Sequence, residues 1–349
     1  MQKDANIFDI ARIAGVSKST VSRVMNGHAG VSEATRKRVQ QAIADCTYIP
    51  NNSARSLSSI TTQSVVLLVH GIANPFFSRV ITLIFEEMRG KNYELILHNC
   101  ELREDISITD VAVRIYKEKR PKGMIVLGGH FEANYLPLKA MAQPITDGRN
   151  RHQATGIPIV MVSATIRSTE DRSWFSSITI DDENEGAHMA LHINENGHRD
   201  VAVIGHSYFR EQGMYRTFKQ LGVRTHIAAL DYDRAYQFKT GYKAAKKMLA
   251  QGGFTCIACQ SDVLAIGAMK AVHEVGLRIP EDISVVGFDG IENSAYTQPP
   301  LTTFMQPYEQ MAIKSVEILL GIIEGTRTHE HLILQTTLVE GASMRSVGG

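Results

Sequence analysis

Hydrophobic residues recur at helical spacing through the first 45 residues of the chain. The pattern predicts two short helices around a tight turn, because Gly15 follows the last apolar position of the first helix and Ser17 can cap the second. A third helix is predicted over Val31–Asp45, with Ser32 as its cap, and Pro50 prevents a helix from continuing. The predicted buried positions are Ile7, Ile10, Ala11 and Ala14, then Val16, Val21 and Val24, then Val39, Ala42, Ile43 and Cys46.

The exposed side of the second predicted helix is polar and cationic. Lys18, Ser19, Ser22 and Arg23 lie together on it, close to the helix N-terminus. A helix-turn-helix places such a surface in the major groove of DNA, with its first residues at the base edges. The alternative is a small helical hairpin with a solvated polar face.

From Gln63 onward, short apolar runs alternate with amphipathic stretches. Continuous apolar runs are typical of buried parallel strands, and their alternation with helices favours an α/β fold with doubly wound parallel sheets. About eight to ten strands suit two sheets better than one. The predicted strands are Val65–Val69, Leu95–Leu97, Met124–Leu127, Ile157–Val162, Val201–Ile204, Ile227–Leu230, Cys256–Cys259 and Ile283–Phe288. The predicted helices between them include Phe76–Arg89, Ile106–Lys119, Ala187–Asn194, Tyr242–Ala250 and Val263–Val275.

Length and charge indicate that the chain has several domains with different charge. A chain of 349 residues predicts about two or three domains. Residues 1–60 hold 3 Lys, 5 Arg and 4 Asp or Glu, a net charge of +4; because the whole chain carries +1, the remainder carries −3. A small basic module joined to a mildly acidic body suits nucleic-acid contact at one end of the chain.

Candidate metal and catalytic motifs are weak. Cys256 and Cys259 have the spacing of a metal-binding pair, but in a strand these positions face opposite sides, and we expect them in the core. His188 and His192 are paired at i, i+4 and are expected on a helix surface. No phosphate-binding loop or nucleophile elbow appears, so no enzyme, cofactor or metal is expected. No signal peptide or span of about 20 apolar residues is present, which predicts a cytoplasmic protein without membrane contact.

The first 51 residues contain specific motifs. Ala14-Gly-Val-Ser-Lys-Ser-Thr-Val-Ser-Arg-Val24, followed by Val31-Ser and by Tyr48-Ile-Pro-Asn51, resembles the DNA-binding headpiece of the LacI/GalR family of bacterial repressors. The resemblance continues to about residue 340. It implies a helix-turn-helix headpiece at 1–50, a hinge helix or linker at 51–62, and a periplasmic-binding-protein-like effector-binding and dimerisation domain at 63–349.

The resemblance also implies how the body is divided. Two α/β lobes are expected, with the chain crossing between them three times, near Ile180–Asp182, Pro299–Thr303 and Leu332–Gln335. The N-lobe would comprise about 63–180 and 303–332, and the C-lobe about 181–300 and 333–345. Met141–Ala154 is longer than the usual connection in the family and is expected to be an exposed loop without an assigned role.

The resemblance assigns a set of DNA contacts. Lys18, Ser19 and Arg23 would specify bases, since arginine to guanine is the commonest base contact. Composition alone makes 51–60 a flexible linker, whereas the resemblance implies a hinge helix that orders on DNA, with the apolar wedge of Leu57 in the minor groove. The remaining implied DNA contacts are Ser17, Thr20, Ser22, Asn26, Asn51, Ala54 and Arg55.

Ligands of open α/β sheets bind beyond the carboxyl ends of the strands, and four such places stand out. After the first strand, Asn74 is a candidate donor or acceptor, and Phe76 and Phe77 either stack on a sugar or pack in the core. The resemblance places Arg210, in Arg-Glu-Gln-Gly213, on ligand hydroxyls or on a carboxylate, and Asp289 on sugar hydroxyls as a bidentate acceptor. The remaining implied effector contacts are Ser261, Asp262 and Tyr236.

Some of these positions depart from the family pattern. Ser261 stands where the family has a ligand-binding asparagine, and a hydroxyl reaches less far. Asp262 either contacts ligand or caps the following helix. Gly290 stands where a second aspartate is common, and the spacing does not decide whether Tyr232 or Tyr236 faces the cleft.

Together these features predict a dimeric transcriptional repressor that binds a near-palindromic operator and responds to a small molecule, expected to be a sugar or a sugar derivative. The sequence does not indicate whether the molecule acts as inducer or co-repressor. A binding protein for sugar uptake is disfavoured by the basic headpiece and the lack of a signal peptide. A sugar-processing enzyme is disfavoured because no nucleophile or acid/base pair is evident.

Overall fold

The computed structural model describes residues 7–25, 30–45, 63–100, 107–129, 135–143, 156–164, 171–205, 208–230 and 237–348. Its contacts divide the chain into two compact units, Met1–Thr62 and Gln63–Gly349. Several residues to which the sequence assigns a role lie outside the described residues: the expected core residue Cys46, Asn26, Asn51, Ala54, Arg55 and Leu57 among the expected DNA contacts, and Tyr232 and Tyr236.

The first unit contains the three predicted helices, α1 (Ile7–Ala14), α2 (Lys18–Met25) and α3 (Glu33–Asp45). Gly15 ends α1 in a left-handed conformation with φ of 61°. The N–H of Gly15 donates to the carbonyl of Arg12 and that of Val16 to the carbonyl of Ala11, which is the hydrogen-bond pattern of a Schellman cap. The Ser17 hydroxyl accepts the Thr20 N–H at 3.2 Å and thereby caps α2, as predicted.

A single small core joins these helices. Ile10, Val21 and Val39, one residue from each helix, are completely buried. Val24 and Ala42 extend the same cluster. The apolar spacing in the sequence therefore predicted both the helices and the side each one buries.

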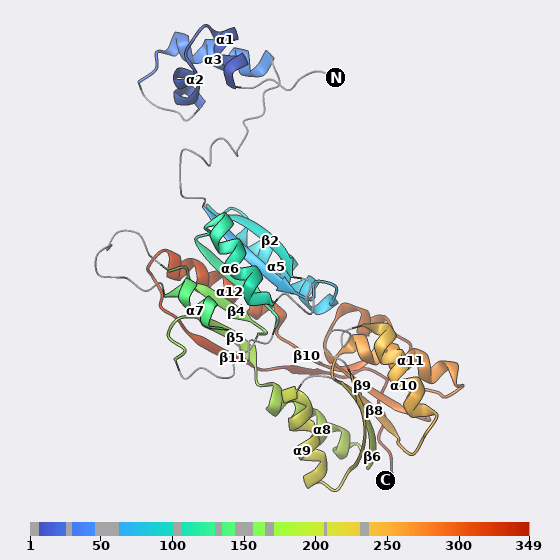
Figure 1. Cartoon of the computed structure of the whole chain (residues 1–349). Coiled ribbons are helices and arrows are strands. Elements are labelled where there is room, and N and C mark those ends of the chain that lie inside the picture. The colour runs from blue at the N-terminus through green and yellow to red at the C-terminus, as the bar shows by residue number, and fades with distance from the viewer. Residues whose placement is uncertain are drawn as a thin grey trace. The chain divides into compact units, whose positions relative to one another are not determined.

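The second unit has two lobes, each built on a six-stranded sheet of described residues (Figure 1). In the first lobe every strand pairing is parallel, and the order is β11 (His331–Leu334), β5 (Ser176–Ile180), β4 (Ile159–Val162), β3 (Gly123–Leu127), β1 (Ser64–His70) and β2 (Glu94–Cys100). Alternate residues of β1 enter different clusters. One face of the first sheet packs on α5 (Pro75–Met88) and α12 (Tyr308–Ile323). The other face of that sheet packs on α6 (Ile108–Lys119) and α7 (Leu136–Ala142).

The second lobe repeats this strand order. Its sheet runs β12 (Thr337–Val339), β10 (Thr302–Met305), β9 (Ser284–Asp289), β8 (Cys256–Cys259), β6 (Asp200–Gly205) and β7 (Arg224–Ala229), and only β12 is antiparallel. Helices α8 (Asp182–Glu195) and α9 (Tyr208–Gln220) cover one face. Helices α10 (Phe238–Leu249) and α11 (Asp262–Glu274) cover the other, as Figure 1 shows.

Glycines allow the helices of the second lobe to pack at close range. A Cβ added to Gly186 of α8 would lie 2.1 Å from the backbone oxygen of Arg210, so only glycine fits there. Gly241 of α10 and Gly267 of α11 are equally close to the backbone of the facing helix. Both helix pairs of this lobe are therefore held nearer than a β-carbon at these positions would permit.

One predicted crossing between the lobes is wrong, and another falls where it was expected. The strand Thr302–Met305 pairs with β9 in the second sheet, so the chain crosses at Gln306–Pro307 and not at Pro299–Thr303. The strand His331–Leu334 pairs with β5 in the first sheet, so the last crossing falls after Leu334, within the predicted range Leu332–Gln335. Both strands are short and mixed in polarity, and their pairing partners, not their composition, determine the lobe to which they belong.

Other expectations have mixed outcomes. Cys256 and Cys259 point to opposite faces of the second sheet, into different core clusters, as their spacing predicted. Met141 was expected in an exposed loop but is buried at the end of α7; the rest of that predicted loop beyond Gln143 lies outside the described residues. His188 is exposed as expected, whereas His192 is half-buried with its ring edge-on to Phe304.

Candidate functional site

The structure supports the predicted surface on α2. Val21 and Val24 are buried on one side of the helix, and Lys18, Ser19 and Arg23 are exposed on the other. The Ser17 hydroxyl, besides capping the helix, lies 2.8 Å from the Ser19 hydroxyl and 2.9 Å from that of Thr20. Thr20 and Ser22 are half-buried. The first two turns of α2 therefore present short polar side chains and two cations on a rigid helix.

A second polar cluster lies at the carboxyl ends of the strands in the second lobe. Asp289 is the last residue of β9, Gln260 follows β8, and Gln306 follows β10. Arg210 from α9 and Asp182 from the start of α8 complete the cluster. Parallel strands end at the same edge, so residues distant in sequence meet there.

Arg210 is at the centre of this cluster. Its guanidinium is almost buried and donates to Asp182 Oδ1 from Nε at 3.2 Å and from Nη2 at 2.6 Å. Nη1 donates to the Gln260 carbonyl at 2.6 Å and lies 3.9 Å from Asp289 Oδ1. The guanidinium carbon lies 3.5 Å from the centre of the Phe288 ring, a cation–π contact. These contacts fix the orientation of the guanidinium.

Asp289 is buried in an unusual environment. Its Oδ1 accepts a hydrogen bond of 2.7 Å from Gln306 Nε2, whereas Oδ2 and Gln306 Oε1 have no hydrogen-bond partner among the described residues. Its φ of 109° is rare for a residue with a Cβ and is typical of functional sites. Burial raises the pKa of Asp289 to about 7, despite the opposing effect of Arg210. Two buried acceptors are thus available to a hydroxyl donor.

Ser261 and Asp262 serve the fold. The Ser261 hydroxyl is fully buried and accepts the Leu264 N–H, so Ser261, and not Asp262, caps α11. Asp262 Oδ1 accepts from the Thr303 hydroxyl at 2.6 Å and Oδ2 from the Ile291 N–H at 2.8 Å. Burial raises the pKa of Asp262 to about 6, although these hydrogen bonds lower it. Asp262 therefore joins α11 to β10 and to the loop after β9, a role that the sequence did not indicate.

The first lobe contributes mainly apolar groups. The Asn74 side chain accepts the Phe76 N–H at 3.1 Å and caps α5. Phe76 is buried in the core, which decides between its two predicted roles in favour of packing. Phe77 is only partly buried, and its ring lies beside Gly71 and Gly128, which follow β1 and β3. Phe77 is therefore the aromatic residue that remains at the strand ends of this lobe.

A cavity of about 690 Å³ lies between the two lobes. Residues of α5 from Pro75 to Thr82 and Tyr308 of α12 form the wall from the first lobe, and residues 290–293 form the wall from the second. The guanidinium of Arg79 lies 5.9 Å from the centre of the Tyr308 ring. This size suits a small molecule.

Asp182 and Gln306 were not among the predicted site residues. Gln306 directly follows a strand, which is the position that the strand-end argument singles out, but β10 was not recognised as a strand. Asp182 is 28 residues from Arg210 in sequence, and only the packing of α8 on α9 joins them. Among the described residues, no group of three or more His, Cys, Asp or Glu is arranged to hold a metal ion. No described helix combines the length and apolar composition that crossing a bilayer requires.

Family models match both units. Residues 6–51 match the model described as bacterial regulatory proteins, lacI family. Residues 190–344 match a periplasmic binding protein-like domain. The two matches cover α1–α3 and most of the second lobe.

Similar proteins agree with these models. The chain is 35% identical to the HTH-type transcriptional regulator MalR of Clostridium butyricum, over 96% of this chain and 98% of that protein. It is 31% identical to the HTH-type transcriptional repressor PurR of Aliivibrio salmonicida, over 95% and 96% respectively. These relatives are named as regulators and repressors, not as enzymes.

Solved structures share the fold. A lac repressor dimer bound to operator and the anti-inducer ONPF superposes with a TM-score of 0.76 at 24% identity, covering 98% of this chain and 100% of that one. A complex of the transcriptional regulator CelR with cellobiose gives a TM-score of 0.66 at 24% identity, covering 97% and 99%. The identity to MalR over nearly the full length of both proteins decides the family. The chain belongs to the lacI family of bacterial regulatory proteins.

Proposed function

We propose that this protein is a homodimeric repressor that binds a near-palindromic DNA operator in the cytoplasm and whose DNA affinity is controlled by a sugar-like molecule bound between its two lobes. The observation that carries the effector part is the pair of buried acceptors, Asp289 Oδ2 and Gln306 Oε1, beside the fixed guanidinium of Arg210. Buried polar atoms are normally hydrogen-bonded, and a polyhydroxylated ligand supplies the missing donors.

The DNA part rests on α2. Lys18, Ser19 and Arg23 are exposed on a helix whose other side is locked into the core of the headpiece. Similar proteins named as repressors include PurR, and a lac repressor structure contains operator DNA in a dimer. Two headpieces would read two half-sites, which is why a near-palindromic operator is expected.

Effector and DNA would be coupled by linkage. A molecule that favours one arrangement of the lobes changes DNA affinity by the same factor by which DNA changes the affinity for that molecule. Ser261 is buried as a helix cap, so the ligand set differs from that of relatives that use asparagine there, and we assign the effector contacts to Arg210, Asp289, Gln306 and Phe77.

Binding to DNA from upstream of the protein's own coding region, compared with random DNA at several salt concentrations, tests the proposal. We expect a short footprinted palindrome and a specificity ratio that stays large as salt rises. Sugars and sugar phosphates would then be screened for release or enhancement of binding. Equal, strongly salt-dependent affinity for both DNAs, unchanged by added metabolite extract, would contradict it.

Replacing Arg23 sharpens the test. We expect Arg23→Ala to lower the preference for operator over random DNA by about 1–3 kcal/mol, since one bidentate base contact contributes that much. Arg12→Ala is the matched control, because Arg12 is an exposed arginine of α1 outside the proposed contact surface. Competition footprinting of both variants measures the ratio, and an unchanged ratio for Arg23→Ala would remove this residue from base recognition.

A further inference from the structure

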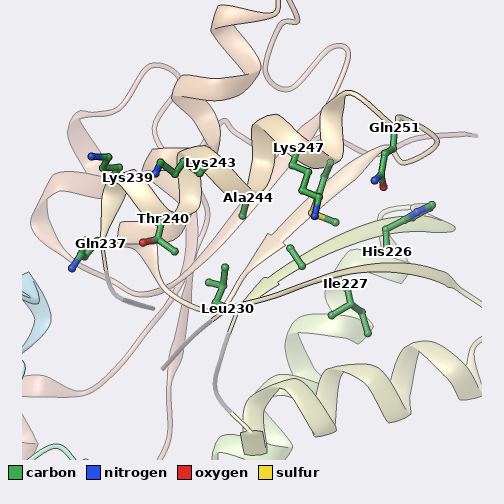
Figure 2. Close-up of a pocket in the computed structure, with 12 residues that line it drawn as sticks. His226, Ile227, Leu230, Gln237, Lys239, Thr240, Lys243, Ala244, Lys247 and Gln251 are labelled. Atoms are coloured by element: carbon green, nitrogen blue, oxygen red, sulfur yellow. The ribbon is translucent and has the colours of Figure 1, made fainter. Parts of the chain in front are cut away.

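A groove runs along the outer edge of the second lobe, between strand β7 and helix α10 (Figure 2). Its volume is about 800 Å³, and neither Arg210 nor Asp289 is among the residues that line it. The strand contributes His226 and Ile227 to the wall, and Leu230 follows them. Helix α10 contributes Lys239, Lys243 and Lys247. Neither the family match nor the proposed effector site accounts for this groove.

The helix wall carries unbalanced positive charge. Lys239, Lys243 and Lys247 follow one another at intervals of four residues on one side of α10, and all three are exposed. Helix α10 contains no acidic residue, and no carboxylate of the described residues lines the groove or pairs with these lysines. The neighbouring Lys246, by contrast, is paired with Glu274 on α11. The groove therefore attracts negative charge.

The strand wall has an open backbone edge. Strand β7 ends the described sheet and pairs only with β6. The N–H of Arg224 donates to the Arg199 carbonyl, toward β6. Because successive peptide groups of a strand point to opposite edges, the backbone groups of Thr225 and Ile227 point outward. The Ile227 side chain is 48% exposed.

The spacing of the two walls matches one kind of occupant. Lysines four residues apart on a helix are separated by about 6 Å along the axis. Alternate residues of an extended chain, whose side chains share a face, are separated by about 6.6–6.8 Å. A strand added to β7 would thus bring every second side chain opposite the next lysine. A compact anion would meet one or two of the lysines only.

We propose that this groove binds an extended acidic segment of a partner protein, which pairs with the free edge of β7 and places acidic residues at alternate positions on Lys239, Lys243 and Lys247. Addition of a strand to an open sheet edge is an established mode of peptide recognition, in which backbone pairing gives affinity and side chains give specificity. Such a partner would act on the protein independently of the small molecule between the lobes.

The test uses the full-length protein and a fluorescein-labelled nonapeptide in which glutamate alternates with valine and threonine. A second peptide of the same composition, with its glutamates grouped at one end, is the control for charge alone. Fluorescence anisotropy at low salt should show tighter binding of the alternating peptide. Equal affinity for the two peptides, or no binding, would overturn the proposal; the lysines would then only protect the edge against pairing with other strands.

Variants separate the two walls of the groove. We expect the double variant Lys243→Glu, Lys247→Glu to weaken binding of the alternating peptide about tenfold. Lys219→Glu, an exposed lysine on the other face of the same lobe, should leave it unchanged. Ile227→Pro should also weaken binding, because proline removes an outward N–H. A melting temperature equal to that of the wild type would show that each variant is folded.

Double-stranded DNA is the competing occupant. If the Lys243→Glu, Lys247→Glu variant loses affinity for random duplex DNA and keeps its affinity for the alternating peptide, the groove contacts nucleic acid and the proposal is wrong. If the peptide affinity falls and the DNA affinity does not, the proposal is supported.

Discussion

The two lobes share one strand order yet differ in what they place at the ends of the strands. In both sheets the first strand lies between the second and the third, and the last strand joins at the far edge. The first lobe ends its strands with glycines and the half-buried ring of Phe77. The second places Asp289 and Gln306 there, together with Arg210 from α9, and all three are buried. The same topology therefore provides an apolar wall in one lobe and directional polar groups in the other.

The second lobe positions charged side chains, and its helices pack closely around them. Gly186 lets α8 approach the backbone of Arg210, and the first residue of α8, Asp182, accepts two hydrogen bonds from that arginine. In the first lobe, the three atoms nearest to a Cβ added to Gly321 of α12 would be side-chain atoms of Arg327, at 2.8–3.1 Å, and not backbone atoms.

The largest expected effect comes from breaking the charge cluster. Arg210→Ala leaves Asp289 and Asp182 without their cation, and removing one partner of a buried pair costs about 3–5 kcal/mol. Arg79→Ala, an exposed arginine of the first lobe, should change stability by less than about 0.5 kcal/mol.

Urea unfolding with two probes measures this contrast lobe by lobe. Trp174, the only tryptophan of the chain, is fully buried in the first lobe, so its fluorescence follows that lobe, while circular dichroism follows both. Arg210→Ala should lower the midpoint seen by circular dichroism. An unchanged circular dichroism midpoint would show that the cluster does not stabilise the second lobe.

A smaller effect is expected from closing the space between α8 and α9. Gly186→Ala forces the helices apart, and overpacking of this kind costs about 1–3 kcal/mol. Gly321→Ala should cost less than Gly186→Ala, because the atoms to be displaced belong to the partly exposed side chain of Arg327 and not to backbone, and because alanine is the better helix former by about 1 kcal/mol. Thermal unfolding of the two variants distinguishes them, and equal melting temperatures would remove the difference in packing between the lobes.

The polar cluster of the second lobe should also make stability depend on pH. Burial raises the pKa of Asp289 to about 7 in the folded protein, whereas the carboxyl of the unfolded chain has its ordinary pKa of 3.8. Between these two pH values the folded state binds more protons than the unfolded chain. The stability that protonated Asp289 contributes is therefore lost as pH rises from about 4 to about 7. Asp289→Asn should flatten this part of the profile, measured as urea midpoints at pH 5, 6, 7 and 8. Parallel profiles for variant and wild type would contradict the raised pKa.

The sequence predicted local features better than distant contacts. The headpiece followed from apolar spacing and from the Ser17 and Gly15 signals, since each depends on residues within one turn. The buried strands of both lobes were evident because they are continuous apolar runs. Four strands were not predicted, among them β5, which starts with two serines, and β12, which has three residues. Their partners, far away in sequence, stabilise them.

The polar site shows the same limit. Arg210 and Asp289 were predicted through family motifs, but Gln306 lies 17 residues from Asp289, and no local pattern joins them. Ser261 was expected at the ligand because of its place in a motif. In the structure Ser261 caps α11. A serine before an apolar helix is a local capping signal, but the family motif directed attention to the ligand instead.

The path of the chain also determines which parts of this protein can be exchanged by recombination. Because the first sheet needs β11 and the second sheet needs β10 and β12, neither lobe is encoded by one continuous stretch. A single crossover within the body would give a hybrid in which at least one sheet combines strands from two parents. A crossover near Thr62 would transfer residues 1–62 as one complete unit. The first unit can therefore be exchanged in one step, whereas a foreign lobe would require several crossovers.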